Sequence, residues 1–311
     1  MTILIQLALL TIGFVMLVKG ADWFVDGSSG IADKFGIPQL VIGLTIVAMG
    51  TSAPEAAVSI TAAFKGTADI TVGNVVGSNI LNVFIILGLA SAITSIAVAK
   101  TTVKYEIPFM LAITVLFMCF GYTGGTINRI EGVLLWAAFV GYLLYMFWLV
   151  KSGQADAEEI EVKGSMGKML LLVAVGLVLI VWGSDVTVDA ATELAKIFGM
   201  SERFIGLTVV ALGTSLPELF TSVTAARKGK ADIAIGNIVG SNIFNILFVV
   251  GTSAIIIPIT FAASFVIDCL VATAAGVILW LFVFRKRKLT RVGGVVMLIC
   301  YAAYFVYLLG M

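Results

Sequence analysis

Residues 43–88 read GLTIVAMGTSAPEAAVSITAAFKGTADITVGNVVGSNILNVFIILG, and residues 206–251 read GLTVVALGTSLPELFTSVTAARKGKADIAIGNIVGSNIFNILFVVG. Each position in the second stretch lies 163 residues after its counterpart without a gap, and 28 of the 46 positions are identical. An internal repeat of this length indicates that the chain is built from two similar halves. We therefore predict a first half at 1–150, a linker at 151–167 and a second half at 168–311.

The composition is that of a chain surrounded by lipid. Of its 311 residues, 60% are hydrophobic and 12% are charged, and the mean hydropathy is +1.13. A soluble domain is nearer half apolar and a quarter charged. The three cysteines are scattered without CxxC spacing and there is no histidine, which argues against a disulfide framework or a zinc site. The net charge of +1 gives no reason to expect a nucleic-acid partner.

Apolar stretches long enough to cross roughly 30 Å of hydrocarbon recur along the sequence. They predict an all-α integral membrane fold with ten transmembrane helices in two inverted five-helix repeats. The inversion follows from the odd number, because a second copy of a five-helix unit enters the membrane from the opposite side, as in many secondary transporters. The predicted spans are 2–24, 38–63, 70–94, 105–122, 130–150, 168–188, 201–226, 233–257, 262–284 and 291–309.

Lysine and arginine residues are distributed unequally between the two sets of predicted loops. If the N-terminus is outside, the inside loops hold 14 basic residues and the outside loops hold four. Cytoplasmic loops of membrane proteins carry an excess of lysine and arginine. We therefore predict a multi-pass protein of the inner (plasma) membrane with a cytoplasmic linker and both termini extracytoplasmic.

Two glutamates, Glu55 and Glu218, lie inside apolar spans, each in the motif GTSxPE. An ionisable side chain at this depth costs several kcal/mol unless it has a partner, so its presence indicates a function. Two ionised glutamates carry a charge of −2, which one Ca²⁺ or two Na⁺ would neutralise. Calcium takes six to eight oxygen ligands.

The proline before each glutamate supplies further oxygen atoms. Pro54 and Pro217 have no N–H and clash with the carbonyl four residues earlier, which frees carbonyl groups near Thr51 and Thr214. Freed carbonyls at membrane depth persist only where they face protein or a polar cavity. We expect these carbonyls and the two carboxylates to form an oxygen cage for a hard cation.

The second part of each repeat places a hydroxyl and an amide on one helical face. Ser78 and Asn82 are four residues apart, as are Ser241 and Asn245. Neighbouring glycines form GxxxG pairs that allow close helix packing. This face would bring further oxygen atoms to the carboxylates, although such residues can also serve only as hydrogen bonds between helices. We interpret the adjacent Asn79 and Asn242 as packing or capping residues.

The paired motifs GTSAPE…GNVVGSNILN and GTSLPE…GNIVGSNIFN resemble the two alpha repeats of the sodium/calcium exchanger family, within the calcium/cation antiporter superfamily. The resemblance covers both motif pairs and the ten-helix layout. It implies Na⁺-driven Ca²⁺ exchange by alternating access, in which helices 1 and 6 slide against the other eight. It also implies a set of metal ligands: the carboxylates of Glu55 and Glu218, the carbonyls of Thr51, Thr214, Ala48 and Ala211, the hydroxyls of Ser52, Ser215, Ser78 and Ser241, and Asn82 and Asn245 in the middle.

Several alternatives remain open at this stage. Potassium-dependent family members carry aspartate in the layer of Asn82 and Asn245, so K⁺ co-transport is not expected here. Exchange of H⁺ for Ca²⁺ is the main alternative, because a desolvated carboxylate readily binds a proton. A cation channel is another. We expect no enzymatic activity, since no nucleophile–base pair or HExxH motif is present, and no cofactor or obligatory protein partner.

Four aspartates near the predicted ends of helices 1 and 6 also follow the repeat. Each residue of the first pair lies 163 positions before its counterpart in the second pair, as in the motifs themselves. We interpret them as structural residues of the helix ends, with a role at the ion entrance as the alternative. They are Asp22, Asp26, Asp185 and Asp189.

Overall fold

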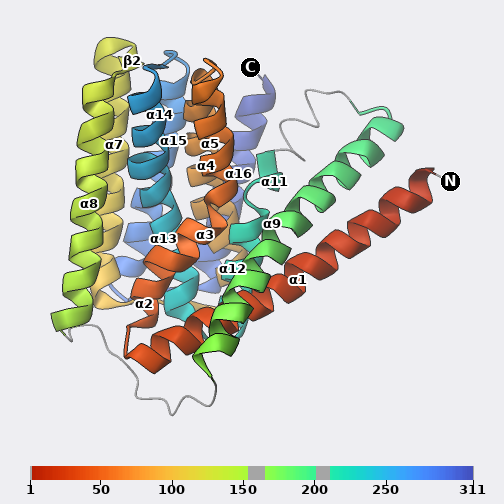
Figure 1. The fold of residues 1–311 in the computed structure, drawn as a ribbon. Coiled ribbons are helices and arrows are strands. Elements are labelled where there is room, and N and C mark those ends of the chain that lie inside the picture. The colour runs from red at the N-terminus through yellow and green to blue at the C-terminus, as the bar shows by residue number, and fades with distance from the viewer. Residues whose placement is uncertain (1, 153–164, 201–210, 311) are drawn as a thin grey trace.

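The chain is almost entirely helical in the computed structural model, which describes residues 2–152, 165–200 and 211–310 (Figure 1). Four segments labelled η are π-helical turns, and four strands have two residues each. The first half contains α1 (Thr2–Phe35), α2 (Gln39–Ile42), η1 (Gly43–Val47), α3 (Ala48–Thr51), α4 (Ala53–Phe64), α5 (Asp69–Leu81), η2 (Asn82–Leu87), α6 (Gly88–Ile93), β1 (Ile96–Ala97), η3 (Thr102–Glu106), α7 (Ile107–Gly124), β2 (Thr126–Ile127) and α8 (Arg129–Ser152). The second half contains α9 (Met166–Ile197), α11 (Ala211–Gly213), α12 (Leu216–Arg227), α13 (Ala231–Phe244), η5 (Asn245–Val250), α14 (Gly251–Ile256), β3 (Ile259–Thr260), α15 (Phe265–Phe284), β4 (Lys288–Leu289) and α16 (Arg291–Gly310).

Eight helices in the described ranges are long and apolar enough to cross a membrane. A ninth span results if the bent pair Gln39–Thr51 and Ala53–Phe64 crosses as one unit. The predicted span at 201–226 lies partly outside the described residues, as does most of the predicted linker at 151–167. The prediction of an all-helical membrane protein is confirmed.

Helices α1 and α9 are much longer than predicted. The sequence predicted spans at 2–24 and 168–188, but the helices contain 34 and 32 residues. At 1.5 Å per residue each is roughly 50 Å long, more than the hydrocarbon thickness, and both lie obliquely to the other helices (Figure 1). The prediction that four aspartates lie near helix ends was wrong. Each helix continues for at least eight residues beyond its last aspartate. The aspartates are Asp22 and Asp26 in α1 and Asp185 and Asp189 in α9.

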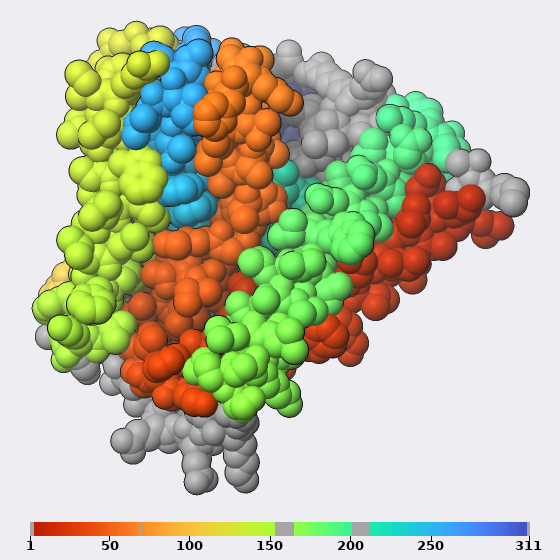
Figure 2. All heavy atoms as spheres, in the orientation of Figure 1, coloured from red at the N-terminus to blue at the C-terminus, as the bar shows by residue number. Residues whose placement is uncertain are grey.

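Glycines allow α1 and α9 to cross at close range. A Cβ atom on Gly20 would lie 2.9 Å from the carbonyl oxygen of Gly176, and one on Gly183 would lie 3.1 Å from that of Gly13. These contacts are reciprocal, because Gly176 and Gly183 are the counterparts of Gly13 and Gly20 in the repeat. Small residues let helix backbones approach closely within a membrane. The two helices form an oblique ridge along one side of the molecule (Figure 2).

The centre of the remaining bundle is formed by the small-residue helices of the repeat. In an apolar 18-residue window of each span, 94% of the residues of Ala231–Ile256 and 72% of those of Ile70–Ile93 are buried. In the corresponding windows of the spans that contain α7, α8, α15 and α16, only 17% to 33% of the residues are buried. Their mean hydropathies are high, and their exposed apolar side chains are suited to contact with lipid. Helices α13 and, to a smaller extent, α5 are therefore enclosed by protein.

Two short antiparallel ribbons connect the halves and were not predicted from the sequence. Strand β1 pairs with β4, with Ile96 opposite Leu289, and β2 pairs with β3, with Ile127 opposite Ile259. Each ribbon contains one strand from each half. Strands of two residues leave no periodic pattern in a sequence, which is why these elements were missed.

The turns that lead into β2 and β4 have the same geometry but different residues. Gly125 has φ +63° and Arg287 has φ +47°. The carbonyl of Gly125 accepts a hydrogen bond from the amide of Phe261, and that of Arg287 accepts one from the amide of Val98, both at 2.9 Å. The left-handed conformation costs a non-glycine residue roughly 1 kcal/mol. The second half thus has a strained arginine where the first half has glycine.

Candidate functional site

The two GTSxPE motifs sit where a helix breaks. In the first half, Ser52 has φ −84° and ψ 9° and separates α3 from α4, which are bent by 50°. Pro54 lies in the first turn of α4, where its missing N–H leaves no bond to the carbonyl four residues earlier. In the second half, Ser215 has φ −91° and ψ 3° and precedes α12, which also has its proline in the first turn. The predicted break at each proline is confirmed.

The structure brings the two carboxylates into one buried region. Glu55 and Glu218 are each only 1% exposed. Glu218 Oε1 accepts a hydrogen bond from Ser52 Oγ of the other half at 2.7 Å. Glu55 Oε1 accepts a longer bond of 3.5 Å from Ser78 Oγ. Both glutamates face the interior of the protein.

Further contacts join the motif of the first half to helix α13 of the second. Thr51 Oγ1 donates to Asn237 Oδ1 at 2.9 Å, and Ser241 Oγ donates to the carbonyl of Ala48 at 3.4 Å. All four residues are fully buried. The glycines of α13 permit this approach, because a Cβ on Gly240 would lie only 2.6 Å from the carbonyl oxygen of Leu44.

Four asparagines cross-link the two motif helices at the centre. Asn79 Nδ2 donates to the backbone carbonyl of Asn242 at 3.3 Å, and Asn242 Nδ2 donates to that of Asn79 at 3.2 Å. Asn82 Nδ2 donates to Asn242 Oδ1 at 2.9 Å, and Asn245 Nδ2 donates to Asn79 Oδ1 at 3.1 Å. The interpretation of Asn79 and Asn242 as packing residues is confirmed.

This network fixes the orientation of the side-chain amides of all four asparagines. A backbone carbonyl can only accept, so Asn79 and Asn242 must turn their NH₂ groups toward it. Their side-chain oxygens then face Asn82 and Asn245, which must donate in turn. The oxygen of each of these last two amides is left over, buried and without a hydrogen-bond partner.

Together with one oxygen of each glutamate, these amide oxygens form two pairs of buried acceptors, and the members of each pair occupy equivalent positions in the two halves. They share full burial and the absence of any hydrogen-bond partner. Leaving such oxygens unpaired costs free energy, which a bound cation would offset. Among the described residues no group of three or more His, Cys, Asp or Glu side chains gathers, so neutral oxygens must complete any such shell. The four atoms are Glu55 Oε2, Glu218 Oε2, Asn82 Oδ1 and Asn245 Oδ1.

The other predicted ligands lie around the same region with unequal burial. Thr51 is fully buried but Thr214 is half-buried, and Ser215 is buried with a hydroxyl that has no partner. Ala211 begins α11, and its side chain lies outside the described part of the chain. The role of each residue as a metal ligand stays a prediction.

The profile of the sodium/calcium exchanger protein family matches residues 5–148 and 168–310. These two segments together cover most of the chain. The chain belongs to the sodium/calcium exchanger family.

Relatives and solved structures agree with this family membership. The Inner membrane protein YrbG of Escherichia coli (strain K12) is 38% identical over 264 residues, which cover 82% of this chain and 81% of the relative. The Sodium/calcium exchanger MaX1 of Methanosarcina acetivorans is 33% identical, with coverage of 98% and 99%. A solved structure of the sodium-calcium exchanger NCX_Mj has a TM-score of 0.85 and 31% identity and covers 98% of this chain and 99% of that one.

Asn74 and Asn237 support the site of this exchanger-family chain but were not singled out from the sequence. Asn74 Nδ2 donates to the backbone carbonyl of Glu55 at 3.1 Å and to Ser59 Oγ at 2.9 Å. Asn237 makes the equivalent two bonds in the second half, at 3.4 and 2.9 Å. The sequence could have indicated these residues, because both asparagines and both serines follow the 163-residue offset of the repeat.

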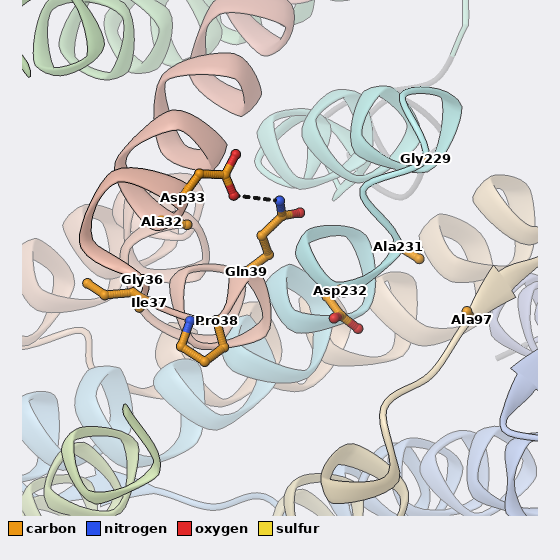
Figure 3. Close-up of a pocket in the computed structure, with 10 residues that line it drawn as sticks. All are labelled: Ala32, Asp33, Gly36, Ile37, Pro38, Gln39, Ala97, Gly229, Ala231 and Asp232. Carbon is orange, nitrogen blue, oxygen red and sulfur yellow. Dashed lines mark hydrogen bonds between the residues drawn. The ribbon is translucent and has the colours of Figure 1, made fainter. Parts of the chain in front are cut away.

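A separate hollow of about 300 Å³ lies among the end of α1, α2 and the start of α13 (Figure 3). Asp33, Gln39 and Asp232 are among the residues that line it, and Gln39 Nε2 donates to Asp33 Oδ1 at 3.1 Å. None of the predicted metal ligands lines this hollow. It is therefore distinct from the buried region between the two glutamates.

Proposed function

We propose that this protein is a secondary active antiporter that exchanges Na⁺ for Ca²⁺ across the membrane by alternating access. The observation that carries the proposal is the set of four buried oxygens, two from carboxylates and two from amides, that have no hydrogen-bond donor. Oxygen atoms of this kind are the ligands that hard cations prefer. Family membership supports the same conclusion.

The charge of the site explains why the two cations would compete. Glu55 and Glu218 together supply −2 when ionised, so one Ca²⁺ or two Na⁺ neutralise them. Calcium would take both carboxylates and the carbonyls of Thr51 and Thr214. The remaining predicted ligands would serve Na⁺: the carbonyls of Ala48 and Ala211 and the hydroxyls of Ser52, Ser215, Ser78 and Ser241, with Asn82 and Asn245 lining the centre.

The proposal includes ten membrane crossings in two inverted repeats, with both termini extracytoplasmic. Reciprocal contacts between α1 and α9 support a twofold relation between the halves. The ribbons support the predicted sidedness, because β1 and β4 come from loops predicted to be cytoplasmic and β2 and β3 from loops predicted to be extracytoplasmic. We place the protein in the inner (plasma) membrane. Its proposed partners are Ca²⁺, Na⁺ and lipid, with no enzymatic step, cofactor, nucleic acid or obligatory protein partner.

The test is ion flux into vesicles that contain the purified protein, with Na⁺, H⁺ and K⁺ gradients imposed separately. Uptake of radioactive calcium should require an outward Na⁺ gradient, and neither a pH gradient nor a K⁺ gradient should replace it. Uptake driven by the pH gradient alone would establish H⁺/Ca²⁺ exchange instead. Uptake without any counter-gradient, driven only by membrane potential, would indicate a channel.

A further inference from the structure

A basic hollow of about 420 Å³ opens where α15 ends and η3 begins. Its basic residues are exposed, and none of them forms an ion pair with a residue in the described part of the chain. Trp280 Nε1 donates to the carbonyl of Val103 at 2.9 Å, which holds the two helices together. The lining includes Lys100, Lys104, Arg285, Arg287, Trp280 and Phe284.

At the other ribbon, the positions equivalent to these four basic residues carry no positive charge. The ribbons have matching registers, so each position around β1 and β4 has a counterpart around β3 and β2. The counterpart of Arg287 is Gly125, which has the same left-handed backbone. All four counterparts of the basic residues are uncharged: Ala263, Ile267, Thr123 and Gly125.

The strained backbone of Arg287 indicates that its side chain does more than set the orientation of the protein in the membrane. Cytoplasmic loops need lysine or arginine only to set orientation, and any position in the loop serves that purpose. Lys286 and Lys288 already provide such charges next to Arg287. A glycine at position 287 would remove the backbone strain, and Gly125 occupies the equivalent position in the first half. Strain that persists in a folded structure points to a function of the side chain that imposes it.

We propose that this basic hollow binds the headgroup of an anionic membrane phospholipid. The phosphate would lie among the guanidinium and ammonium groups, because arginine forms paired hydrogen bonds with phosphate oxygens. The lipid chain would lie against the rings of Trp280 and Phe284, whose centroids are 4.8 Å apart, and residue Phe284 is 54% exposed. Tryptophan is enriched at the depth of the lipid headgroups, and anionic lipids attract basic segments at the cytoplasmic surface.

The test compares thermal unfolding of the full chain in nanodiscs of phosphatidylcholine with unfolding in nanodiscs that also contain phosphatidylglycerol. We expect the anionic lipid to raise the wild-type midpoint by about 4 °C or more. Arg287→Gly should lose at least half of this rise. In phosphatidylcholine alone, the same variant should unfold at the wild-type temperature or above it, because glycine adopts the left-handed backbone without strain. Lys286→Gln is the matched control and should keep the full rise.

Four results would overturn the proposal. The first is an Arg287→Gly variant that responds to phosphatidylglycerol as the wild type does. The second is an equal loss in Lys286→Gln, which would indicate a general surface-charge effect. The third is an equal rise produced by inorganic phosphate in phosphatidylcholine nanodiscs. The fourth concerns the acidic residues of the linker. If their neutralisation removes the difference in midpoint between wild type and Arg287→Gly, the linker and not a lipid occupies the hollow. These acids are Asp156, Glu158, Glu159 and Glu161.

Discussion

Two lysines at equivalent positions of the repeat have different surroundings. Lys228 Nζ lies 3.2 Å from Asp22 Oδ1 and 2.8 Å from Asp26 Oδ1, and it joins the end of α12 to α1. Its counterpart in the first half follows α4 and is exposed. None of the three counterparts forms an ion pair with a residue that the structure describes: Lys65, Asp185 and Asp189.

The difference shows that two halves of similar sequence are held in different environments. Ser52 donates to the glutamate of the other half at 2.7 Å, but the hydroxyl of Ser215 has no partner. Helix α1 packs on α12, where the rings of Phe14 and Phe220 are 6.0 Å apart, and α9 has no comparable contact with α4 in the described ranges. Under the proposed alternating-access mechanism, a second conformation would exchange these environments between the halves, and bound ions would shift the population between the two.

The largest effects are expected at the centre, where both halves should matter equally. Glu55→Gln and Glu218→Gln should each reduce Ca²⁺ exchange by about 100-fold or more, because each removes one of the two buried charges proposed to hold the cation. Vesicle flux measures this loss. The control is Glu106→Gln, which removes a buried carboxylate bonded to Tyr145 outside the site and should leave exchange largely intact. Full transport by either site variant would contradict the proposed function.

The next effect concerns the contact between α1 and α9. A Cβ on Gly176 would lie 2.6 Å from the amide nitrogen of Phe24 and 2.8 Å from the carbonyl oxygen of Gly20. Gly176→Ala should destabilise the protein by up to about 3 kcal/mol and slow exchange, because backbone atoms must move apart. Gly167→Ala in the same helix meets nothing within 4 Å and should have little effect. The measurements are the thermal unfolding midpoint and the initial rate of ion flux. Equal values for the two variants would contradict a close crossing of α1 and α9 at Gly176.

A smaller and unequal effect is expected at the two motif serines. In the absence of Na⁺ and Ca²⁺, Ser52→Ala should destabilise the protein by about 2 kcal/mol, because it removes a hydrogen bond to a buried carboxylate. Ser215→Ala removes a hydroxyl without a partner and should change the stability by less than about 0.5 kcal/mol. The measurement is the unfolding midpoint in ion-free buffer. Equal losses would mean that the asymmetry does not exist in solution.

The smallest effect is expected at the lysines. Lys228→Gln should reduce the population of the described conformation about two- to fivefold, because partly exposed ion pairs contribute at most about 1 kcal/mol. Lys65→Gln should leave that population unchanged or raise it. Thr214 is half-buried and its counterpart Thr51 is fully buried, so the labelling rate of Thr214→Cys in a cysteine-free background reports the population. A faster rate in Lys228→Gln than in Lys65→Gln would contradict the predicted exchange of partners.

The repeat made much of the site predictable from the sequence. Glu55 and Glu218 could be singled out because burying an acid is costly, and Pro54 and Pro217 fixed where the helices break. The central amides followed from helical spacing. The burial of these groups and the helix breaks could be predicted because each rests on local chemistry that occurs twice, and their roles as metal ligands stay predictions.

Other features could not be predicted because they depend on tertiary contacts. The aspartates of α1 and α9 lowered the local hydropathy, so hydropathy placed the helix ends too early. The π-helical turns that begin at Asn82 and Asn245 have no periodic signature of their own. The asymmetry between Lys65 and Lys228 could not be predicted, because both lysines and both pairs of aspartates follow the repeat and nothing local distinguishes them.

The two ribbons limit which motions the molecule can use. Because β1·β4 and β2·β3 each tie one half to the other, the halves cannot swing apart as separate lobes without breaking backbone pairing. The long helices α1 and α9 contribute no strand to either ribbon, and glycines form their mutual contact. In the proposed alternating-access cycle the bundle would therefore act as a stator joined at both rims, and α1 and α9 would slide past it without disturbing the core packing.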